Sequence, residues 1–210
     1  MAIVVWSVLA VVGAYLIGSL SFAVIISRVV GLADPRSYGS KNPGATNVLR
    51  SGNKAAAVAT LVLDAVKGWL PLWAVGVWGP GLGLGDGTFA LVGLAAFVGH
   101  LFPVFFHFKG GKGVATAVGV LFGVNWVLAL AALATFAVLV FFTRYVSLAS
   151  IVAAVFAPVY FLFGADVAWP ASPPMAGALV AMGALLVWRH TDNINRLIQG
   201  KESRLGKKSA

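Results

Sequence analysis

The chain has no cysteine, and it has only six acidic side chains against fifteen lysines and arginines. Without cysteine, disulfide bonds and thiol chemistry are excluded. Three histidines without cysteine or a paired histidine motif make a poor zinc site, so we expect neither a metal nor another cofactor. What fills the 210 residues instead is apolar sequence, which makes up 60% of the chain. Long apolar runs of this kind are typical of a membrane protein.

The basic residues are unevenly distributed, and all fifteen can be drawn on one side of a membrane. They cluster between Arg28 and Lys54, at Lys109 and Lys112, at Arg144, and from Arg189 to Lys208; Lys67 alone lies inside an apolar run. The loops on the opposite side carry only Asp86 and Asp166. The positive-inside rule makes the basic side cytoplasmic. The net charge of +9 therefore indicates membrane orientation and contact with anionic lipids rather than a nucleic-acid partner.

The apolar runs predict an all-α membrane protein, a single domain over residues 1–210. A spanning helix needs about 20 apolar residues. We expect spans at Met1–Ser27, Ala55–Trp78, Phe89–Phe108, Val146–Gly164 and Met175–Trp188, plus two short crossings within Val114–Phe142. The bundle then has seven helices, some of them short, with a periplasmic N-terminus and a cytoplasmic C-terminus. Its cytoplasmic segments are residues 28–54, 109–113, 143–146 and the tail 189–210.

The stretch Val114–Phe142 could be one tilted span, but Lys109 and Lys112 would then face the opposite side from Arg144. If all three are cytoplasmic, the stretch crosses twice or enters and returns, and we choose two crossings. Gly and Asn interrupt helices, and Trp favours the membrane interface. The turn is accordingly expected at Gly123-Val124-Asn125-Trp126.

Two glycine-containing basic segments are candidate phosphate sites. The first runs from Gly39 to Arg50 and combines hydroxyls, amides, two cations and two glycines; its alternative is an ordinary capped turn. The second, Phe108 to Thr116, places three glycines and two lysines directly before a helix, where free N–H groups favour phosphate. It lacks the P-loop spacing because Gly113, not Ser or Thr, follows Lys112, which disfavours a nucleotide site. Its alternative is a turn with snorkelling lysines.

Three further features are candidates of other kinds. At the exit of the last span, His190 and Asn193 are three residues apart and share a helical face; the alternative is a polar helix end that meets lipid phosphates. Asp64 and Lys67 form an i, i+3 pair inside an apolar run, equally compatible with a structural or a functional role. His100 is expected to be a buried, hydrogen-bonded structural histidine.

These motifs follow one another in a distinctive order between the spans. They are Gly18-Ser19, Ser40 to Asn47 with Arg50, Asp64 with Lys67-Gly68, Gly99-His100 with Phe102-Pro103, Phe108 to Thr116, Tyr145 to Ile151, and Arg189-His190 with Asn193-Ile194 and Arg196-Leu197. Over nearly the whole chain, this order resembles the bacterial acyl-phosphate:glycerol-3-phosphate acyltransferase family. The family's first motif often has Ser-Gly-Asn where this chain has Ser40-Lys41-Asn42.

The resemblance implies an enzyme of the bacterial inner membrane that catalyses the first acylation of phospholipid biosynthesis at its cytoplasmic face. It would transfer a fatty acyl group from acyl phosphate to the 1-hydroxyl of sn-glycerol 3-phosphate, giving lysophosphatidic acid and phosphate. The implied catalytic residues are Ser40, Arg50, Lys112, His190 and Asn193. The implied phosphate-binding residues are Asn42, Gly44, Thr46, Asn47, Lys109, Gly110, Gly111, Gly113 and Thr116. Both substrates and membrane lipids are the expected partners, and we expect a monomer.

Two other classes of function remain as alternatives. A membrane transporter of a phosphorylated anion also needs cations and helix breaks, but such sites tend to lie at the midplane between repeats. A structural subunit would not need such dense polar loops. An acyl-CoA enzyme with an H-x-x-x-x-D motif is disfavoured, since Phe105, Lys112 and Asn195 stand five residues after the three histidines.

Overall fold

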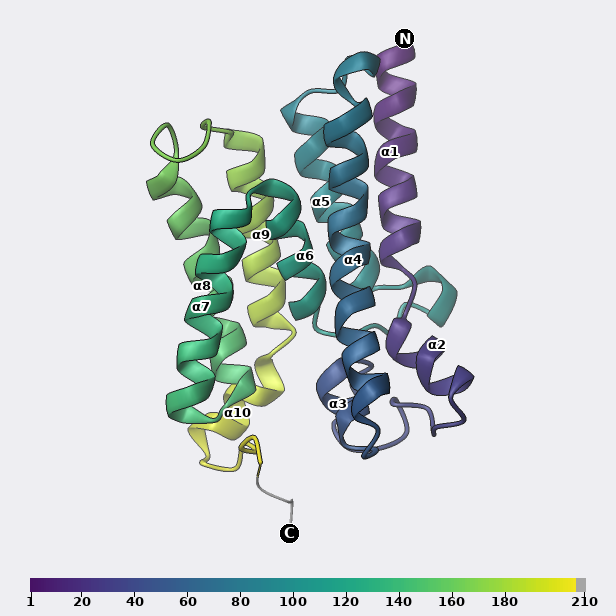
Figure 1. Cartoon of the computed structure of the whole chain (residues 1–210), viewed down its shortest axis with the longest axis vertical. Coiled ribbons are helices and arrows are strands. Elements are labelled where there is room, and N and C mark those ends of the chain that lie inside the picture. Colours follow the sequence, from purple (N-terminus) through teal and green to yellow (C-terminus); the bar gives the residue numbers. More distant parts are fainter. Residues whose placement is uncertain (207–210) are drawn as a thin grey trace. The chain divides into compact units, whose positions relative to one another are not determined.

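The structure is a computed structural model that describes residues 1–206 and consists of helices joined by turns and loops (Figure 1). The all-α prediction is therefore confirmed for the described residues. Contacts within the chain divide it into two compact units, Met1–Val124 and Asn125–Ala210, here called unit 1 and unit 2. The single domain stays a prediction. Lys207 and Lys208, which belong to the predicted cytoplasmic tail, lie outside the described part of the chain.

Unit 1 begins with two helices where the sequence predicts one. α1 spans Ala2–Gly18 and α2 spans Phe22–Val29, and the pair is bent by 45° at the break. Together the two helices have the length and apolarity of one broken span, so the span over Met1–Ser27 stays a prediction. A break inside an apolar segment frees backbone carbonyls that need a partner. Lys67 supplies one, because its Nζ donates to the carbonyl of Leu20 at 2.6 Å.

The centre of unit 1 is α4 (Lys54–Trp78), which packs against α1, α5 (Asp86–Leu101) and α6 (Val114–Val124). Glycine permits the closest of these contacts. A Cβ at Gly119 of α6 would collide with the carbonyl oxygen of Ala65 in α4, and one at Gly68 would collide with the carbonyl oxygen of Thr116. The two helices therefore meet backbone against backbone.

The third predicted span is also shorter as a helix than expected. α5 ends at Leu101, and Phe102 has φ −130° and ψ 65°, outside the helical region. The reason is Pro103, because the residue before a proline is disfavoured in the helical conformation. The 3₁₀ turn η2 follows at Val104–Phe106. The segment Asp86–Phe106 still has the length and apolarity of a span, close to the predicted Phe89–Phe108. Another 3₁₀ turn, η1 (Pro80–Leu82), precedes α5.

Unit 2 contains α7 (Trp126–Thr143), α8 (Val146–Gly164), α9 (Pro173–Trp188) and the short α10 (Thr191–Ile198). α8 packs against α7, α9 and α10. Asn125 begins the unit as the N-cap of α7, and its side-chain oxygen accepts from the backbone N–H groups of Val127 and Leu128. The helix break predicted at Gly123–Trp126 is confirmed.

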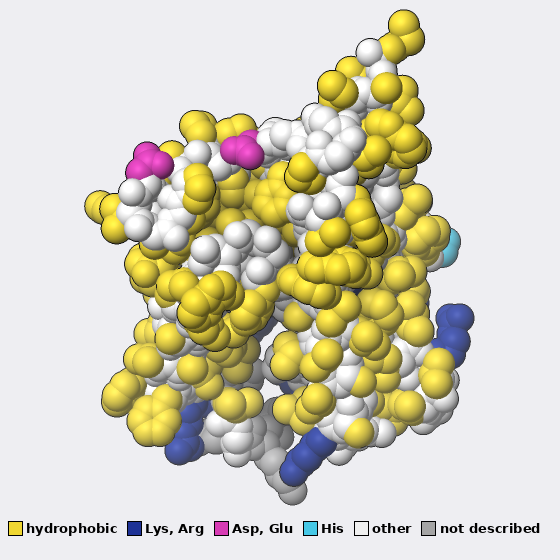
Figure 2. Space-filling view, turned by 45° about the horizontal axis from the view of Figure 1, so that its top comes forward, with side chains coloured by type: hydrophobic (Ala, Val, Ile, Leu, Met, Phe, Trp, Pro, Cys, Tyr) yellow, Lys and Arg dark blue, Asp and Glu magenta, His cyan; other side chains and the backbone are white. Residues whose placement is uncertain are grey.

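Several helices have the length and apolarity of membrane spans. Four segments qualify alone, namely α4, Asp86–Phe106, α7 and α8, and the bent pair α1 and α2 makes up to five, with α6 and α9 as shorter apolar helices. Large apolar side chains are exposed on these helices, including Phe141 at 77% and Phe142 at 76%. Hydrophobic side chains dominate the face drawn in Figure 2. Seven crossings and the orientation of the termini stay predictions.

Candidate functional site

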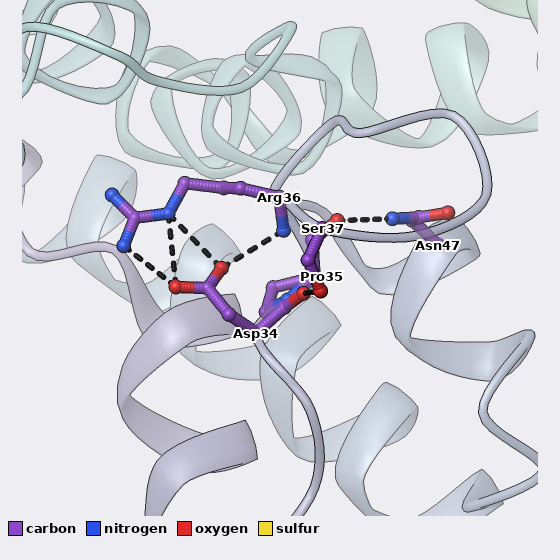
Figure 3. Close-up of polar contacts among 5 residues, drawn as sticks. All are labelled: Asp34, Pro35, Arg36, Ser37 and Asn47. Carbon is purple, nitrogen blue, oxygen red and sulfur yellow. Dashed lines mark hydrogen bonds and ion pairs between the residues drawn. The ribbon is translucent and has the colours of Figure 1, made fainter.

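The loop between α2 and α4 is organised around the buried side chain of Asn47, in the five-residue helix α3 (Ala45–Leu49). Its Nδ2 donates to the carbonyls of Pro35, at 2.6 Å (Figure 3), and Tyr38, at 3.1 Å. Its Oδ1 accepts from the backbone N–H of Ser40 at 3.0 Å and from Nη1 of Arg50 at 3.3 Å. An amide has two N–H donors and two acceptor lone pairs, so these bonds use its full capacity. Asn47, predicted to bind phosphate, therefore shapes the loop and positions Ser40 and Arg50.

An ion pair that the sequence analysis missed stabilises the start of this loop (Figure 3). Arg36 donates to both carboxylate oxygens of Asp34, with Nη2 at 2.6 Å from Oδ2. The Arg36 guanidinium holds the pKa of the Asp34 carboxyl below its ordinary value. It also lies 5.8 Å from the ring centroid of Phe106 in η2, so the loop and the segment after α5 are in contact. The sequence feature that could have indicated this ion pair is the Asp34-Pro35-Arg36 turn.

The remaining predicted residues of the loop lie at or near its surface. Ser40, Lys41, Thr46 and Arg50 are exposed, and Asn42 and Gly44 are partly exposed. Lys41 has φ 56°, in the left-handed region that favours glycine. The chain thus keeps at position 41 a backbone conformation suited to the glycine that the family's motif often has there. Hydroxyls, an amide and two cations are therefore accessible on one loop.

The second predicted segment, Lys109–Gly113, is a tight turn that packs against the end of α5 and leads directly into α6. The N–H of Gly111 donates to the carbonyl of His100 at 3.2 Å. A Cβ at Gly111 would collide with Nε2 of His100 and would lie 3.0 Å from the carbonyl oxygen of Pro43. Since Pro43 belongs to the first loop, the two predicted phosphate-binding segments lie in contact in unit 1. The close packing explains why glycine stands here.

Within this turn the predicted residues differ in accessibility. Lys109 is exposed and Lys112 is half-buried, whereas Gly110, Gly111 and Gly113 are buried. Gly113 has φ 85°, a conformation that glycine adopts without strain. Thr116 is fully buried in α6 with its backbone against Gly68. It lies in a helix contact, so we assign it to packing and not to phosphate binding.

In unit 2, the predicted residues His190 and Asn193 lie where α9 meets α10, and both are buried. His190 is the N-cap residue of α10, and its Nδ1 lies 2.8 Å from the carbonyl oxygen of Leu186. Asn193 lies in the first turn of α10, and its Nδ2 donates to Oε1 of Glu202 at 2.6 Å. The local structure therefore orients both side chains through partners in the same unit.

Glu202 is the central residue of this part of unit 2, and the sequence analysis missed it. Besides the bond from Asn193, it accepts from the Ser147 hydroxyl at 2.8 Å and from Nε of Arg196 at 2.7 Å. Burial raises the pKa of the Glu202 carboxyl, but these hydrogen bonds outweigh it and hold the pKa below its ordinary value. Glu202 is the only glutamate in the chain and stands in an otherwise basic tail, a signal that could have marked it.

Comparison with known sequences supports the family resemblance inferred from these motifs. A family model described as "Glycerol-3-phosphate acyltransferase" matches residues 8–200. A protein of that name from Albidiferax ferrireducens is 65% identical over 195 residues, covering 93% of this chain and 87% of its own. One from Paraburkholderia phymatum is 59% identical over 197 residues, covering 93% of this chain and 90% of its own.

The fold also matches solved structures. The crystal structure of PlsY, an integral membrane glycerol 3-phosphate acyltransferase, in its glycerol 3-phosphate form is 42% identical, with TM-score 0.84 over 95% of this chain and 96% of that chain. The lysophosphatidic acid form is 41% identical, with TM-score 0.82 over 95% of both chains.

Proposed function

Since this chain belongs to the glycerol-3-phosphate acyltransferase family, we propose that it transfers a fatty acyl group from acyl phosphate to the 1-hydroxyl of sn-glycerol 3-phosphate. The products are 1-acylglycerol 3-phosphate and inorganic phosphate. The solved structures of PlsY in glycerol 3-phosphate and lysophosphatidic acid forms support the acceptor and the product. The acyl-phosphate donor is our own assignment.

The observation that carries this proposal is the contact between the two glycine-containing segments of unit 1. Gly111 lies against Pro43, so the Lys109–Gly113 turn contacts the loop that bears Ser40 and Arg50. Cations and glycine backbone suit a phosphate, and an arginine can bind it through two hydrogen bonds. We assign Arg50 and Lys112 to the phosphate and the developing negative charge, and Ser40 to orienting a substrate.

The reaction needs no enzyme nucleophile, because acyl phosphate is a mixed anhydride with a good leaving group. The 1-hydroxyl oxygen forms a bond to the acyl carbonyl carbon, and the bond from that carbon to the phosphate oxygen breaks. Inorganic phosphate leaves with the electron pair, and the hydroxyl proton passes to a base, either His190 or a substrate phosphate. The enzyme contributes positioning and electrostatic stabilisation within a ternary complex.

The roles proposed for unit 2 rest on the side chains that its own contacts orient. We assign Asn193 to a hydrogen bond with a substrate, and His190 to proton transfer or to a phosphate contact. Glu202 fixes the Asn193 amide, so it is a positioning residue in this scheme.

We further propose that the protein lies in a bacterial inner membrane with seven spans and its active site at the cytoplasmic face, as a monomer in contact with membrane lipids. The positive-inside bias of the loops supports this orientation. The two shorter helices α6 and α9 then complete the count beyond the five long segments.

The test is phosphate release by the purified protein with palmitoyl phosphate and glycerol 3-phosphate, beside the same assay with palmitoyl-CoA. Release that requires both substrates, with no product from the thioester, is the expected result. Acylation from the thioester would overturn the donor assignment. Inactivity with both donors, together with saturable glycerol 3-phosphate uptake into vesicles, would favour the transporter alternative.

A further inference from the structure

An ion pair inside an apolar helix of unit 1 has no role in the mechanism above. Asp64 and Lys67 of α4 are each 2% exposed, and Lys67 Nζ lies 2.7 Å from Asp64 Oδ1. Two charges removed from water cost several kcal/mol each unless they are well partnered, and apolar side chains of similar volume often serve stability as well. The bond from Lys67 to Leu20 explains the lysine. It does not explain why a carboxylate faces α5.

The carboxylate of Asp64 faces His100, which is 7% exposed and lies near the end of α5. Nδ1 of His100 lies 3.7 Å from the Asp64 Oδ1 atom. This distance is longer than a hydrogen bond, so the contact is electrostatic. A carboxylate at this distance from a ring nitrogen favours a proton on that nitrogen and so favours one orientation of the imidazole.

The other side of the imidazole faces the glycine turn. A Cβ at Gly111 would collide with Nε2 of His100, and the His100 carbonyl accepts the N–H of Gly111 at 3.2 Å. A Cβ at Gly110 would collide with the same carbonyl. Both the ring and the backbone of His100 therefore contact the turn, whereas its Nδ1 is directed to the buried ion pair.

We propose that His100, oriented by Asp64 and Lys67, is a positioning residue that holds the Lys109–Gly113 turn in its anion-binding conformation. It thereby sets the affinity for the phosphate of glycerol 3-phosphate. This inference rests on the proposed function, since it takes the bound anion to be that substrate. The structural role expected for His100 from the sequence thus extends to the geometry of the substrate site.

Asparagine and glutamine test this role because each retains one side of the imidazole. His100→Asn keeps a polar group near the Nδ1 position, which faces Asp64, and His100→Gln keeps one near the Nε2 position, which faces Gly111. We expect His100→Asn to raise the KM for glycerol 3-phosphate about tenfold, because it removes the contact of the ring with the turn, with kcat nearly unchanged. His100→Gln should stay within about threefold of the unsubstituted protein.

Asp64→Asn should raise the same KM in the same direction, and the double variant Asp64→Asn/His100→Asn should be no worse than His100→Asn alone, because both act through one contact. The matched control is Thr60→Val, which removes a different buried polar group of α4, a hydroxyl that bonds within its own helix. This control should leave the KM unchanged.

Hydrogen–deuterium exchange gives a readout that does not depend on turnover. The peptide covering residues 109–113 should exchange faster in His100→Asn and Asp64→Asn than in Thr60→Val. An unchanged KM and unchanged exchange in both variants would overturn the proposal, and loss of kcat at constant KM would make His100 catalytic instead. If the unsubstituted protein releases no phosphate, the proposed function fails, whereas titration with glycerol 3-phosphate and the exchange data still test the positioning role.

Discussion

Each of the two units holds its predicted site residues with one buried polar side chain, but the two side chains differ in charge. In unit 1 the neutral amide of Asn47 makes four hydrogen bonds within its loop. In unit 2 the carboxylate of Glu202 accepts three, from Ser147, Asn193 and Arg196. An amide both donates and accepts, so it can satisfy backbone carbonyls, whereas a carboxylate gathers donors only. The hydrogen bonds of Asn47 therefore do not depend on the protonation of a carboxylate, whereas those of Glu202 do.

The largest expected effect comes from Lys112, whose cation is assigned to the substrate and not to holding other side chains in place. Lys112→Ala should abolish turnover with little loss of folded protein, because its charge is assigned to substrate phosphate and not to packing. Phosphate release and size-exclusion chromatography measure the two outcomes. Lys109→Ala is the matched control and should lose less activity, since Lys109 is exposed where Lys112 is half-buried. Near-normal turnover of Lys112→Ala would remove it from the site.

Asn47→Ala tests the neutral side of the comparison. It leaves two backbone carbonyls and two N–H donors without their partner, which should destabilise the loop by about 3 kcal/mol. Thermal unfolding in detergent and phosphate release should both decline. Asn47→Asp keeps the acceptor for Ser40 and Arg50 but loses both donors, and it should fall between Asn47→Ala and the unsubstituted protein. Equal stability of all three would contradict the central role of Asn47.

Glu202→Gln tests the charged side of the comparison with almost no change in shape. The bond with Arg196 loses its charge assistance, and one amide N–H now faces other donors, so we expect a loss of about 1–2 kcal/mol. Thermal unfolding measures this loss, with Asp192→Asn as a control on the exposed side of α10. A Glu202→Gln protein as stable as the control would show that the charge is unimportant.

The contribution of Glu202 to stability should depend on pH, whereas the contribution of Asn47 should not. Because the pKa of Glu202 lies below its ordinary value of 4.5, its stabilisation is present above that pH and is lost as the pH falls through the lower folded-state value. The stability difference between the unsubstituted protein and Glu202→Gln should therefore shrink from about pH 5 downward. The corresponding difference for Asn47→Ala should stay constant, and a parallel change in both would break the comparison.

The smallest effect concerns the strained residue in the loop of unit 1. Lys41→Gly removes the strain of a left-handed side-chain-bearing residue, about 1 kcal/mol, but adds freedom to the unfolded chain. We expect a net gain of less than about 1 kcal/mol in thermal unfolding. Turnover should stay near normal, and a large loss of activity would instead make the Lys41 cation part of the phosphate site.

The sequence predicted what depends on neighbours in the chain and missed what depends on distant partners. The break at Asn125 was predictable because its side chain caps the helix that follows within three residues. The bend between α1 and α2 was not, since it is stabilised by Lys67, 47 residues away. The bond of Glu202 with Ser147 was missed for the same reason, because Ser147 lies 55 residues before it.

In the candidate site, too, the sequence predicted residue types but not the contacts made with distant partners. The glycines and cations of both segments were identified from their types and spacing alone. Which of them are exposed depended on tertiary contacts, so Asn47 and Thr116 proved to be buried in the loop and in a helix contact. The partnership between Asp64 and His100 joins two helices and left no local pattern to find.

The glycines of unit 1 also determine how this protein can be made more robust in the laboratory. Replacing helical glycine by alanine is a common engineering route, because it restricts the unfolded chain. At Gly18, Gly68 and Gly119 the added methyl would collide with the backbone carbonyl of a neighbouring helix, so alanine would destabilise the protein at these positions. Gly13 in α1 and Gly177 in α9 have open space around the same position. A stabilised version for crystallisation or inhibitor screening should therefore start from those two.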